Sequence, residues 1–522
     1  MAQKYIFTII GSGTSGWLTA LYLQKYYPYC NIRVIASSDI GILGAGEGTT
    51  TNVLSLLSRL DISETEFFKH TNATIKEAIK FTNWNGDGKS YHHIFNNKEW
   101  FNPTYFNRTN NTMLPPIILD EIANGDNLDN ILIDVDLHKQ NFIKKTLSLN
   151  PHNKVEDPIQ HFDSVGANAI HFDAALMAKF LKKIALRRGV EYVDDEVIDF
   201  SLDKNEYIEH IHTKSGKELP TNFVFDCSGF RKLVIGGLYK SKWISYKDHL
   251  PMKRAIGFSM DFEDENEIPP YTESIAMDFG WVWKIPLQTG FRCGYVFDSN
   301  YITEDEAKEE VIKTFGNDVI FGKSFEFEAG YYEESWQKNC IAIGLSAGFI
   351  EPLEATSIMV QASSLDIFLD NFIGIDPDKG HYRDRYNKVI KSVNDENLEF
   401  IYTHYLTKRT SSKFWTEFRE KNTPPQFVVR LLDECKLTMP DYTFFFENNK
   451  NYWTYNLLSW YSILAGLELF DRIKAAELIE GMLMSTRRDE ILIFINKYKA
   501  NIKLSAASSF IKHSEFIKYM LK

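Results

Sequence analysis

The stretch Lys4-Tyr-Ile-Phe-Thr-Ile-Ile10 leads directly into Gly11-Ser-Gly-Thr-Ser-Gly16, and these residues decide the fold. The pattern predicts a short apolar strand, a glycine-rich turn and a helix from about residue 15 to 26. A second strand is predicted over 32–36. This order of elements is typical of a nucleotide-binding α/β domain.

Each glycine of the turn has a different use. Gly11 can adopt a positive φ, Gly13 lets the backbone approach a pyrophosphate, and Gly16 lets helix and strand pack closely. The first turn of the helix then offers unpaired N–H groups to the phosphates. A tight turn without a ligand is the competing interpretation, which the flanking strand and helix disfavour. The second strand ends in Ala36 rather than in the usual acidic ribose ligand, so the identity of the dinucleotide stays open at this point.

The composition limits the class of protein. A chain of 522 residues, with 44% hydrophobic and 25% charged residues, is long enough for at least two domains. The net charge of −12 disfavours nucleic acid and anionic membrane as partners. The five scattered cysteines show no metal-ligand spacing, so we expect no metal site, and reduced thiols in the cytoplasm. We expect neither a signal peptide nor a membrane-spanning segment.

Two later stretches also bring small residues to a ligand. Gly41-Ile-Leu-Gly-Ala-Gly-Glu-Gly48 is a loop whose backbone can lie against a ligand. Residues 340–358 predict a strand, a turn at Gly344, and a helix start whose N–H groups can meet a cofactor. Glu351 and Glu354 lie close to that helix start, where simple partners of the helix dipole are common.

A helix is predicted from about Ser63 to Lys80. Its lysines by themselves indicate a solvated face; they are Lys69, Lys76 and Lys80. The next motif, Tyr91-His-His-Ile-Phe95, favours aromatic pocket lining over a metal site. A further helix is predicted over 174–188, and a mostly helical region beyond about residue 375.

A tryptophan pair marks a later strand. Trp281 and Trp283 are two residues apart and therefore share one face, and Pro286 is predicted to end the strand. A packed aromatic pair in a sheet is the competing interpretation. Near the C-terminal end, a run of aromatic residues from Tyr452 to Tyr461 is suited to closing a pocket.

Together these motifs resemble the flavin-dependent halogenases of the tryptophan-halogenase type. The resemblance covers most of the chain through about residue 365 and, more loosely, the region around Trp460. Five pieces occur in the family's order: GSGTSGWLTA, GILGAGEGTT, the Lys76 segment with FTNW, GWVWKIP and GFIEPLEAT. The turn Gly344-Leu-Ser-Ala347 departs from the Gly-Asp motif of the related FAD hydroxylases.

The resemblance implies an α/β fold with a Rossmann-like FAD-binding core of the hydroxylase and monooxygenase type. The implied fold also has a substrate-binding lobe and a mostly helical C-terminal region that closes the substrate pocket. The implied domains are a halogenase core over 1–375 and a helical region over 376–522. Within the core, the nucleotide-binding segments are about 1–60, 160–235 and 325–375. The substrate-lobe insertions are about 61–160 and 236–325.

The resemblance also implies the site residues. Lys76 is expected to be catalytic with Glu354 near it, and backbone N–H groups near Thr356 and Ser357 are expected to hold the halide. The arene is expected against four residues, namely His93, Phe95, Trp453 and Tyr455. The residues expected to bind FAD are Gly11, Gly13, Thr14, Ser15, Gly16, Gly44, Gly46, Glu47, Val197, Leu345 and Ile358. The family signature corresponds to Trp281, Trp283 and Pro286.

The implied reaction consumes FAD reduced by a separate flavin reductase, O2 and a halide. Hypohalous acid formed from them passes to Lys76, which positions it for electrophilic attack on a small electron-rich arene. A lysine suits this task because it is a compact donor whose pKa moves readily on burial. Glu354 is implied to hold the protonation state of Lys76, and to stabilise the cationic ring intermediate or accept its proton.

The sequence departs from the family in two places. Ala355-Thr356-Ser357 replaces the common Ser-Thr-Gly, which keeps bromide and iodide open beside chloride. The C-terminal aromatic residues do not match the set that clamps tryptophan, so a phenol, an indole or another arene competes with free tryptophan.

Two other functions compete with halogenation. An FAD-dependent aromatic hydroxylase is disfavoured by Leu345 and by the tryptophan pair. A catalytically silent flavoprotein is disfavoured because Lys76 and Glu354 are both present. The oligomeric state stays open, a homo-oligomer included.

Overall fold

The computed structural model describes residues 5–40, 46–95, 116–131, 141–144, 169–372, 380–448, 454–484, 486, 488–493, 495–496 and 510–522. Packing divides the chain into two units, each assembled from three stretches. Unit 1 comprises Met1–Ala73, His171–Lys247 and Phe327–Asp395. Unit 2 comprises Thr74–Ile170, Asp248–Glu326 and Glu396–Lys522. This division groups the C-terminal stretch with the two insertions; the functional domains named from the sequence stay a prediction.

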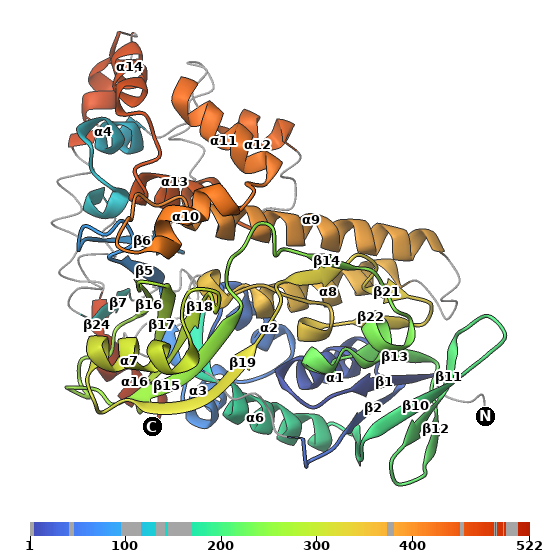
Figure 1. The fold of residues 1–522 in the computed structure, drawn as a ribbon. Coiled ribbons are helices and arrows are strands. Elements are labelled where there is room, and N and C mark those ends of the chain that lie inside the picture. Colours follow the sequence, from blue (N-terminus) through green and yellow to red (C-terminus); the bar gives the residue numbers. More distant parts are fainter. Residues whose placement is uncertain are drawn as a thin grey trace, which may run out of the picture. The chain divides into compact units, whose positions relative to one another are not determined.

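The core of unit 1 is a six-stranded sheet of order β21-β22-β13-β1-β2-β9 (Figure 1). All neighbours pair in parallel except the edge strand β21. Its strands are β1 (Ile6–Ile10), β2 (Asn31–Ala36), β9 (Glu191–Asp194), β13 (Phe223–Asp226), β21 (Trp336–Gln337) and β22 (Cys340–Ala342). Every residue of β1 is buried, as expected of a central parallel strand covered on both faces.

Two helices of unit 1 confirm the sequence prediction. α1 (Thr14–Tyr26) follows β1, and α6 (Ala174–Arg187) packs against it. α6 begins where predicted because the Asp173 side chain accepts a hydrogen bond from the Leu176 N–H.

The remaining elements of unit 1 are short strands and helices around this core. They are β3 (Gly46–Gly48), α2 (Asn52–Arg59), α3 (Glu64–Thr71), β10 (Val197–Leu202), β11 (Ile208–Thr213), β12 (Glu218–Pro220), η4 (Gly229–Arg231), η5 (Leu233–Leu238), β14 (Trp243–Ser245), β20 (Gly330–Tyr332), η6 (Gly344–Ser346), β23 (Gly348–Phe349), η7 (Pro352–Glu354) and α8 (Ser357–Asn371). β8 (Ala169–Asp173) pairs antiparallel with β3 through its last three residues.

Unit 2 contains a seven-stranded sheet of order β19-β15-β18-β17-β16-β5-β6. Only β16 and β5 pair in parallel. Its strands are β5 (Ala78–Thr82), β6 (Ser90–Ile94), β15 (Arg254–Met260), β16 (Tyr271–Ala276), β17 (Gly280–Leu287), β18 (Gly290–Phe297) and β19 (Ile320–Glu326). Apolar side chains of this sheet and of α7 (Glu304–Phe315) form one buried cluster.

Helices make up most of the rest of unit 2. The helices are α4 (Pro116–Asn124), η3 (Leu128–Ile131), α10 (Lys413–Lys421), α11 (Gln426–Leu437), α12 (Tyr442–Glu447), α13 (Leu457–Gly466), α14 (Arg472–Leu483) and α16 (His513–Met520). The short strands are β4 (Thr74–Lys76), β7 (Phe142–Lys144) and β24 (Phe510–Lys512). α9 (Gly380–His404) contributes residues to both units. Figure 1 shows α4 beside α14, although the two are far apart in the sequence. Among the described residues, none of the helices is long and apolar enough to cross a membrane.

The predicted helix over 63–80 is wrong in its second half. α3 ends at Thr71 because Asn72 adopts the left-handed conformation, with φ of 59°, and the chain then continues as the strands β4 and β5. Lys76 is therefore a strand residue. The strand predicted to end at Pro286 extends one residue further, since Leu287 still pairs with Gly290.

Candidate active site

The glycine turn of unit 1 has the geometry that its sequence predicts. Gly11 has a φ of 114°, and a Cβ there would lie 2.2 Å from the carbonyl oxygen of Cys227. A Cβ on Gly16 would lie 2.0 Å from the carbonyl oxygen of Gly11, so only glycine lets α1 pack so closely. At Gly13, which begins α1, an added Cβ would meet nothing within 4 Å. The turn is thus closed toward the protein and open at Gly13.

This opening fits the pyrophosphate of a dinucleotide. Gly13 is the N-cap of α1, and no side chain caps that helix end. Its N–H groups and the positive end of the helix dipole therefore remain for an anionic ligand. Thr14 and Ser15 are the first two residues of α1 and are partly buried.

A second turn packs against the start of α1. Gly344 has a φ of 69°, and a Cβ there would lie 2.2 Å from Ser15 Oγ. The Ser15 hydroxyl donates to Gln361 Oε1 at 3.1 Å, and Gln361 Nε2 donates back to the Ser15 carbonyl at 3.2 Å. Sequence reasoning missed Gln361, because nothing in a glutamine on α8 signals a partner on α1. Leu345 is partly buried in η6, and Ile358 is buried in the first turn of α8.

The other residues expected at the cofactor differ in their environments. Val197 opens β10 and lies in a buried cluster with Ile10 and Ile35, so its side chain is a packing residue of unit 1. Burial, and then the nearby Asp173, raise the pKa of Glu47 to about 7. Gly46 pairs with Asp173 in the β3–β8 ladder. The expected Gly44 lies outside the described residues.

The segment expected to bind halide is the turn from η7 into α8. Glu354 ends η7 and is buried. Ala355 has a φ of 55°, a conformation that L-residues other than Asn and Asp seldom adopt. Thr356 is the N-cap of α8 without a side-chain hydrogen bond, and Ser357 is exposed in the first turn. The helix start therefore has the backbone geometry of an anion site.

Lys76 lies in unit 2, where its strand is held from several sides. Its side chain is 0% exposed. The Thr74 hydroxyl donates to the carbonyl of Pro286 at 2.7 Å. The Ile75 N–H donates to His513 Nε2 at 2.9 Å, and the Glu77 N–H donates to the carbonyl of Pro270 at 2.7 Å. A lysine this deeply buried is a functional candidate in its own right.

A series of aromatic rings begins beside the lysine within unit 2. Lys76 Nζ lies 4.9 Å from the centre of the Phe95 ring, in cation–π range. The Phe95 and His93 rings are 5.3 Å apart and meet edge to face. His93 lies 5.7 Å from Phe400, which stacks on Tyr455 at 3.7 Å. These rings form a continuous array that begins at the amine.

The structure thus brings together three of the residues expected at the arene, since His93, Phe95 and Tyr455 all belong to the array. The expected Trp453 lies outside the described residues. Sequence reasoning missed Phe400, which lies on α9 with no neighbouring motif to single it out.

The tryptophan pair forms part of the packing of unit 2. Trp281 and Trp283 meet at 6.2 Å with an interplanar angle of 60°. The Trp281 indole N–H donates to the hydroxyl of Tyr405 at 3.1 Å, and Gly294 leaves room for the Trp283 ring. Pro286 contributes its carbonyl to Thr74, so the signature strand supports the strand of Lys76.

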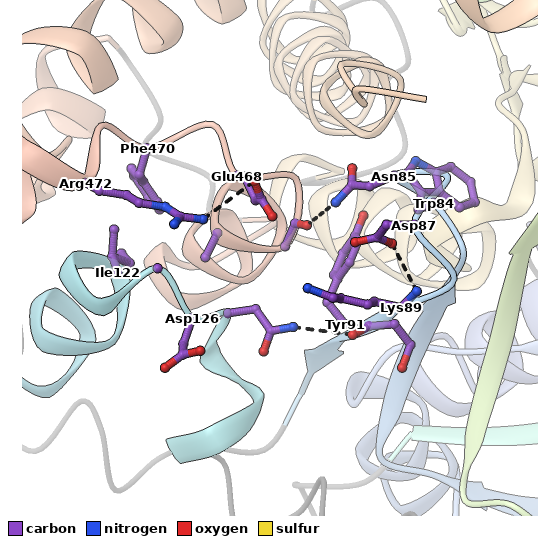
Figure 2. A pocket seen from close by; sticks show the side chains of 15 residues that line it. Trp84, Asn85, Asp87, Lys89, Tyr91, Ile122, Asp126, Glu468, Phe470 and Arg472 are labelled. Carbon is purple, nitrogen blue, oxygen red and sulfur yellow. Dashed lines mark hydrogen bonds and ion pairs between the residues drawn. The ribbon is translucent and has the colours of Figure 1, made fainter. Parts of the chain in front are cut away.

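Unit 2 also has a polar cavity of about 220 Å³ (Figure 2). Figure 2 shows charged and amide side chains around it, among them Asp87, Lys89 and Arg472. Arg472 pairs with Glu468 at 3.6 Å. Its lining residues do not include Lys76, His93 or Phe95, so this cavity is separate from the aromatic array.

The comparison with known protein families decides the assignment. The family model described as tryptophan halogenase matches residues 6–477. The chain belongs to this family. It is therefore a flavin-dependent halogenase, an oxidoreductase whose cofactor is FAD.

Individual relatives agree. The chain is 31% identical over 454 residues to the 7-chloro-L-tryptophan 6-halogenase KtzR of a Kutzneria species, covering 83% of this chain and 85% of the relative. It is 30% identical over 452 residues to the tryptophan 6-halogenase SttH of Streptomyces toxytricini, covering 83% and 84%. Among solved structures, the tryptophan C-6 halogenase Tar14 aligns with a TM-score of 0.84 and 25% identity, over 99% of this chain and 100% of the other.

Proposed function

We propose that this halogenase attaches a halogen to a small electron-rich aromatic ring, using reduced FAD from a separate flavin reductase, O2 and a halide. The observation that carries the proposal is the fully buried amine of Lys76 beside the ring of Phe95. A lysine amine buried beside an aromatic array is suited to holding a polar oxidant against an arene.

When bound, FAD supplies the two-electron chemistry with O2 that oxidises the halide to hypohalous acid. Lys76 then donates a hydrogen bond to that acid, or binds its halogen as a haloamine, and so positions the halogen for the ring. One ring C–H is exchanged for a carbon–halogen bond, with water as the other product. We assign the acceptance of the ring proton to Glu354, a buried carboxyl group.

Tryptophan is the first substrate to test, because the relative SttH is named a tryptophan 6-halogenase and KtzR a 7-chloro-L-tryptophan 6-halogenase. His93 and Phe95 would hold the indole by ring contacts, the kind of interaction they already make with each other. Substituted phenols and other indoles belong in the same test. We place the halide at the backbone N–H groups of Thr356 and Ser357. Because Ser357 adds a side chain where the family commonly has glycine, chloride, bromide and iodide are all compared in the test.

The test is mass spectrometry of tryptophan, indoles and phenols incubated with the protein, FAD, a flavin reductase, NADH and air. Each halide is supplied separately. We expect halogen-shifted products that vanish in Lys76→Ala, while FAD binding measured by fluorescence titration stays unchanged. The matched control is Lys69→Ala, since Lys69 is an exposed lysine on α3.

Three outcomes would contradict the proposal. Oxygen-shifted products without halogen would assign a hydroxylase, and full activity of Lys76→Ala would remove the role of Lys76. Failure to halogenate any arene, with FAD bound, would assign a silent flavoprotein.

A further inference from the structure

The strand that carries Lys76 is only three residues long and is an edge strand of the sheet β3-β8-β4, hydrogen-bonded to β8. Contacts outside this ladder also fix its position. The residues that flank Lys76 are Ile75 and Glu77, and the N–H groups of both are hydrogen-bonded inside unit 2. The partners of these two N–H groups identify the positioning residue.

Both partners lead to the same segment, residues 268–270. The Glu77 N–H donates directly to the carbonyl of Pro270 at 2.7 Å. The Ile75 N–H donates to His513 Nε2, and on the other side of the ring His513 Nδ1 lies 3.1 Å from the carbonyl of Ile268. A carbonyl can only accept, so Nδ1 carries the proton and Nε2 is the acceptor. The imidazole is therefore the neutral Nδ1–H form.

We infer that His513 is a positioning residue for Lys76. Its imidazole bridges Ile75 to Ile268, and together with the Glu77–Pro270 bond it ties both neighbours of Lys76 to one segment. The ring is 0% exposed, so water cannot replace either bond. The backbone of His513 is itself held in place, because its backbone N–H donates to the carbonyl of Asn141 at 2.9 Å.

This inference rests on the proposed function, because it assumes that the place of the Lys76 amine matters for the oxidant. If the strand loosens, hypohalous acid is still formed but escapes before it meets the arene. Replacing His513 should thus change the fate of the oxidant rather than its production. Replacing a residue that only stabilises the fold would instead lower the production of the oxidant and the halogenation of the arene together.

The experiment compares His513→Leu, which removes both bonds, with His513→Gln, which retains a donor and an acceptor. Lys518→Gln is the matched control: Lys518 also anchors α16, through Asn266, but does not touch the strand of Lys76. Amide hydrogen exchange of the peptide around residues 74–77 is read by mass spectrometry. Halogenated arene and a halogenated small enol trap are quantified at equal O2 consumption.

We expect exchange at Ile75 to accelerate at least about tenfold in His513→Leu, since a protecting bond is lost. The ratio of trapped halogen to halogenated arene should rise several-fold, with His513→Gln and Lys518→Gln close to wild type. Unchanged exchange and an unchanged ratio in His513→Leu would overturn the inference, as would a Gln variant as impaired as the Leu variant. If wild type halogenates no arene, the proposed function fails, while exchange still tests the bridge.

Discussion

Lys69 and Lys76 are two turns apart in a helical reading of the sequence, yet they occupy opposite environments. Lys69 is exposed in the last turn of α3, and Lys76 is fully buried on β4. Residue type and spacing predict a solvated face for both. The resemblance to a family singled out Lys76. The contacts that hold its strand come from Pro286 and His513, which bond Thr74 and Ile75 and lie far away in the sequence.

The glycine turn was the most predictable part, because its constraint is local. Gly16 has a carbonyl oxygen 2.0 Å from the position of a Cβ, and Gly13 has open space. We therefore expect Gly16→Ala to lower the free energy of unfolding by about 1–3 kcal/mol, the usual cost of overpacking. Gly13→Ala should leave the stability unchanged and weaken FAD binding, because its methyl group enters the space that we assign to the pyrophosphate.

Thermal unfolding without FAD, together with FAD titration, separates the two glycine variants. Equal losses of stability in both would show that the turn is uniformly packed. Unimpaired FAD binding by Gly13→Ala would move the pyrophosphate away from this helix end.

At the scale of elements, sequence patterns identified the helices that have strong local signals. They failed where strand pairing with distant segments decides between helix and strand. α6 has an N-cap aspartate and a following glycine, and it was found within one residue. The stretch 74–80 contains residues compatible with a helix, but β5 is held between β16 and β6. Those partners lie up to about 200 residues away, beyond the reach of a local pattern. Only Asn72 gave a local sign of the change.

The pairing of β3 with β8 gives a pH-dependent prediction. The pKa of Glu47 is raised to about 7 by burial and by Asp173, so the folded state binds a proton more tightly than the unfolded chain. Stability linked to this group is present below the ordinary glutamate pKa and is lost as the pH rises toward 7. We expect Glu47→Gln to gain melting temperature relative to wild type between pH 5 and pH 8.

A second variant isolates the charge of Asp173. Asp173→Asn keeps an acceptor for the Leu176 N–H and removes the repulsion, so the pH dependence of wild type should weaken. If the difference in melting temperature between Glu47→Gln and wild type is the same at pH 5 and at pH 8, the raised pKa of Glu47 is wrong.

At the scale of the whole molecule, the α/β class and the family could be read from the sequence, whereas the grouping of the segments could not. Each unit collects three stretches of chain, and the last stretch of unit 1 supplies β22 and α8. The side chains that seal β13 include Phe368, whose ring lies 5.2 Å from that of Phe225. Such contacts depend on the complete chain.

A fragment that ends at residue 326 is therefore expected to fail. It leaves β13, a wholly buried strand, as an open edge without β22 and α8, and open apolar edges aggregate. We expect no cooperative thermal transition and no FAD binding from the fragment. Supplying residues 327–522 as a second chain is the control and should restore FAD binding. A stable, FAD-binding fragment would show that unit 1 does not need its last stretch.

The alternation of segments also sets the order of events during synthesis. Ribosomes extend a chain at about 5–20 residues per second, so β1 emerges on the order of tens of seconds before the stretch that begins at Phe327. Throughout that interval the apolar strand of the glycine turn has left the ribosome while its sheet is still incomplete. The newborn chain therefore exposes an apolar sheet edge, which favours aggregation, until residues 327–395 have emerged.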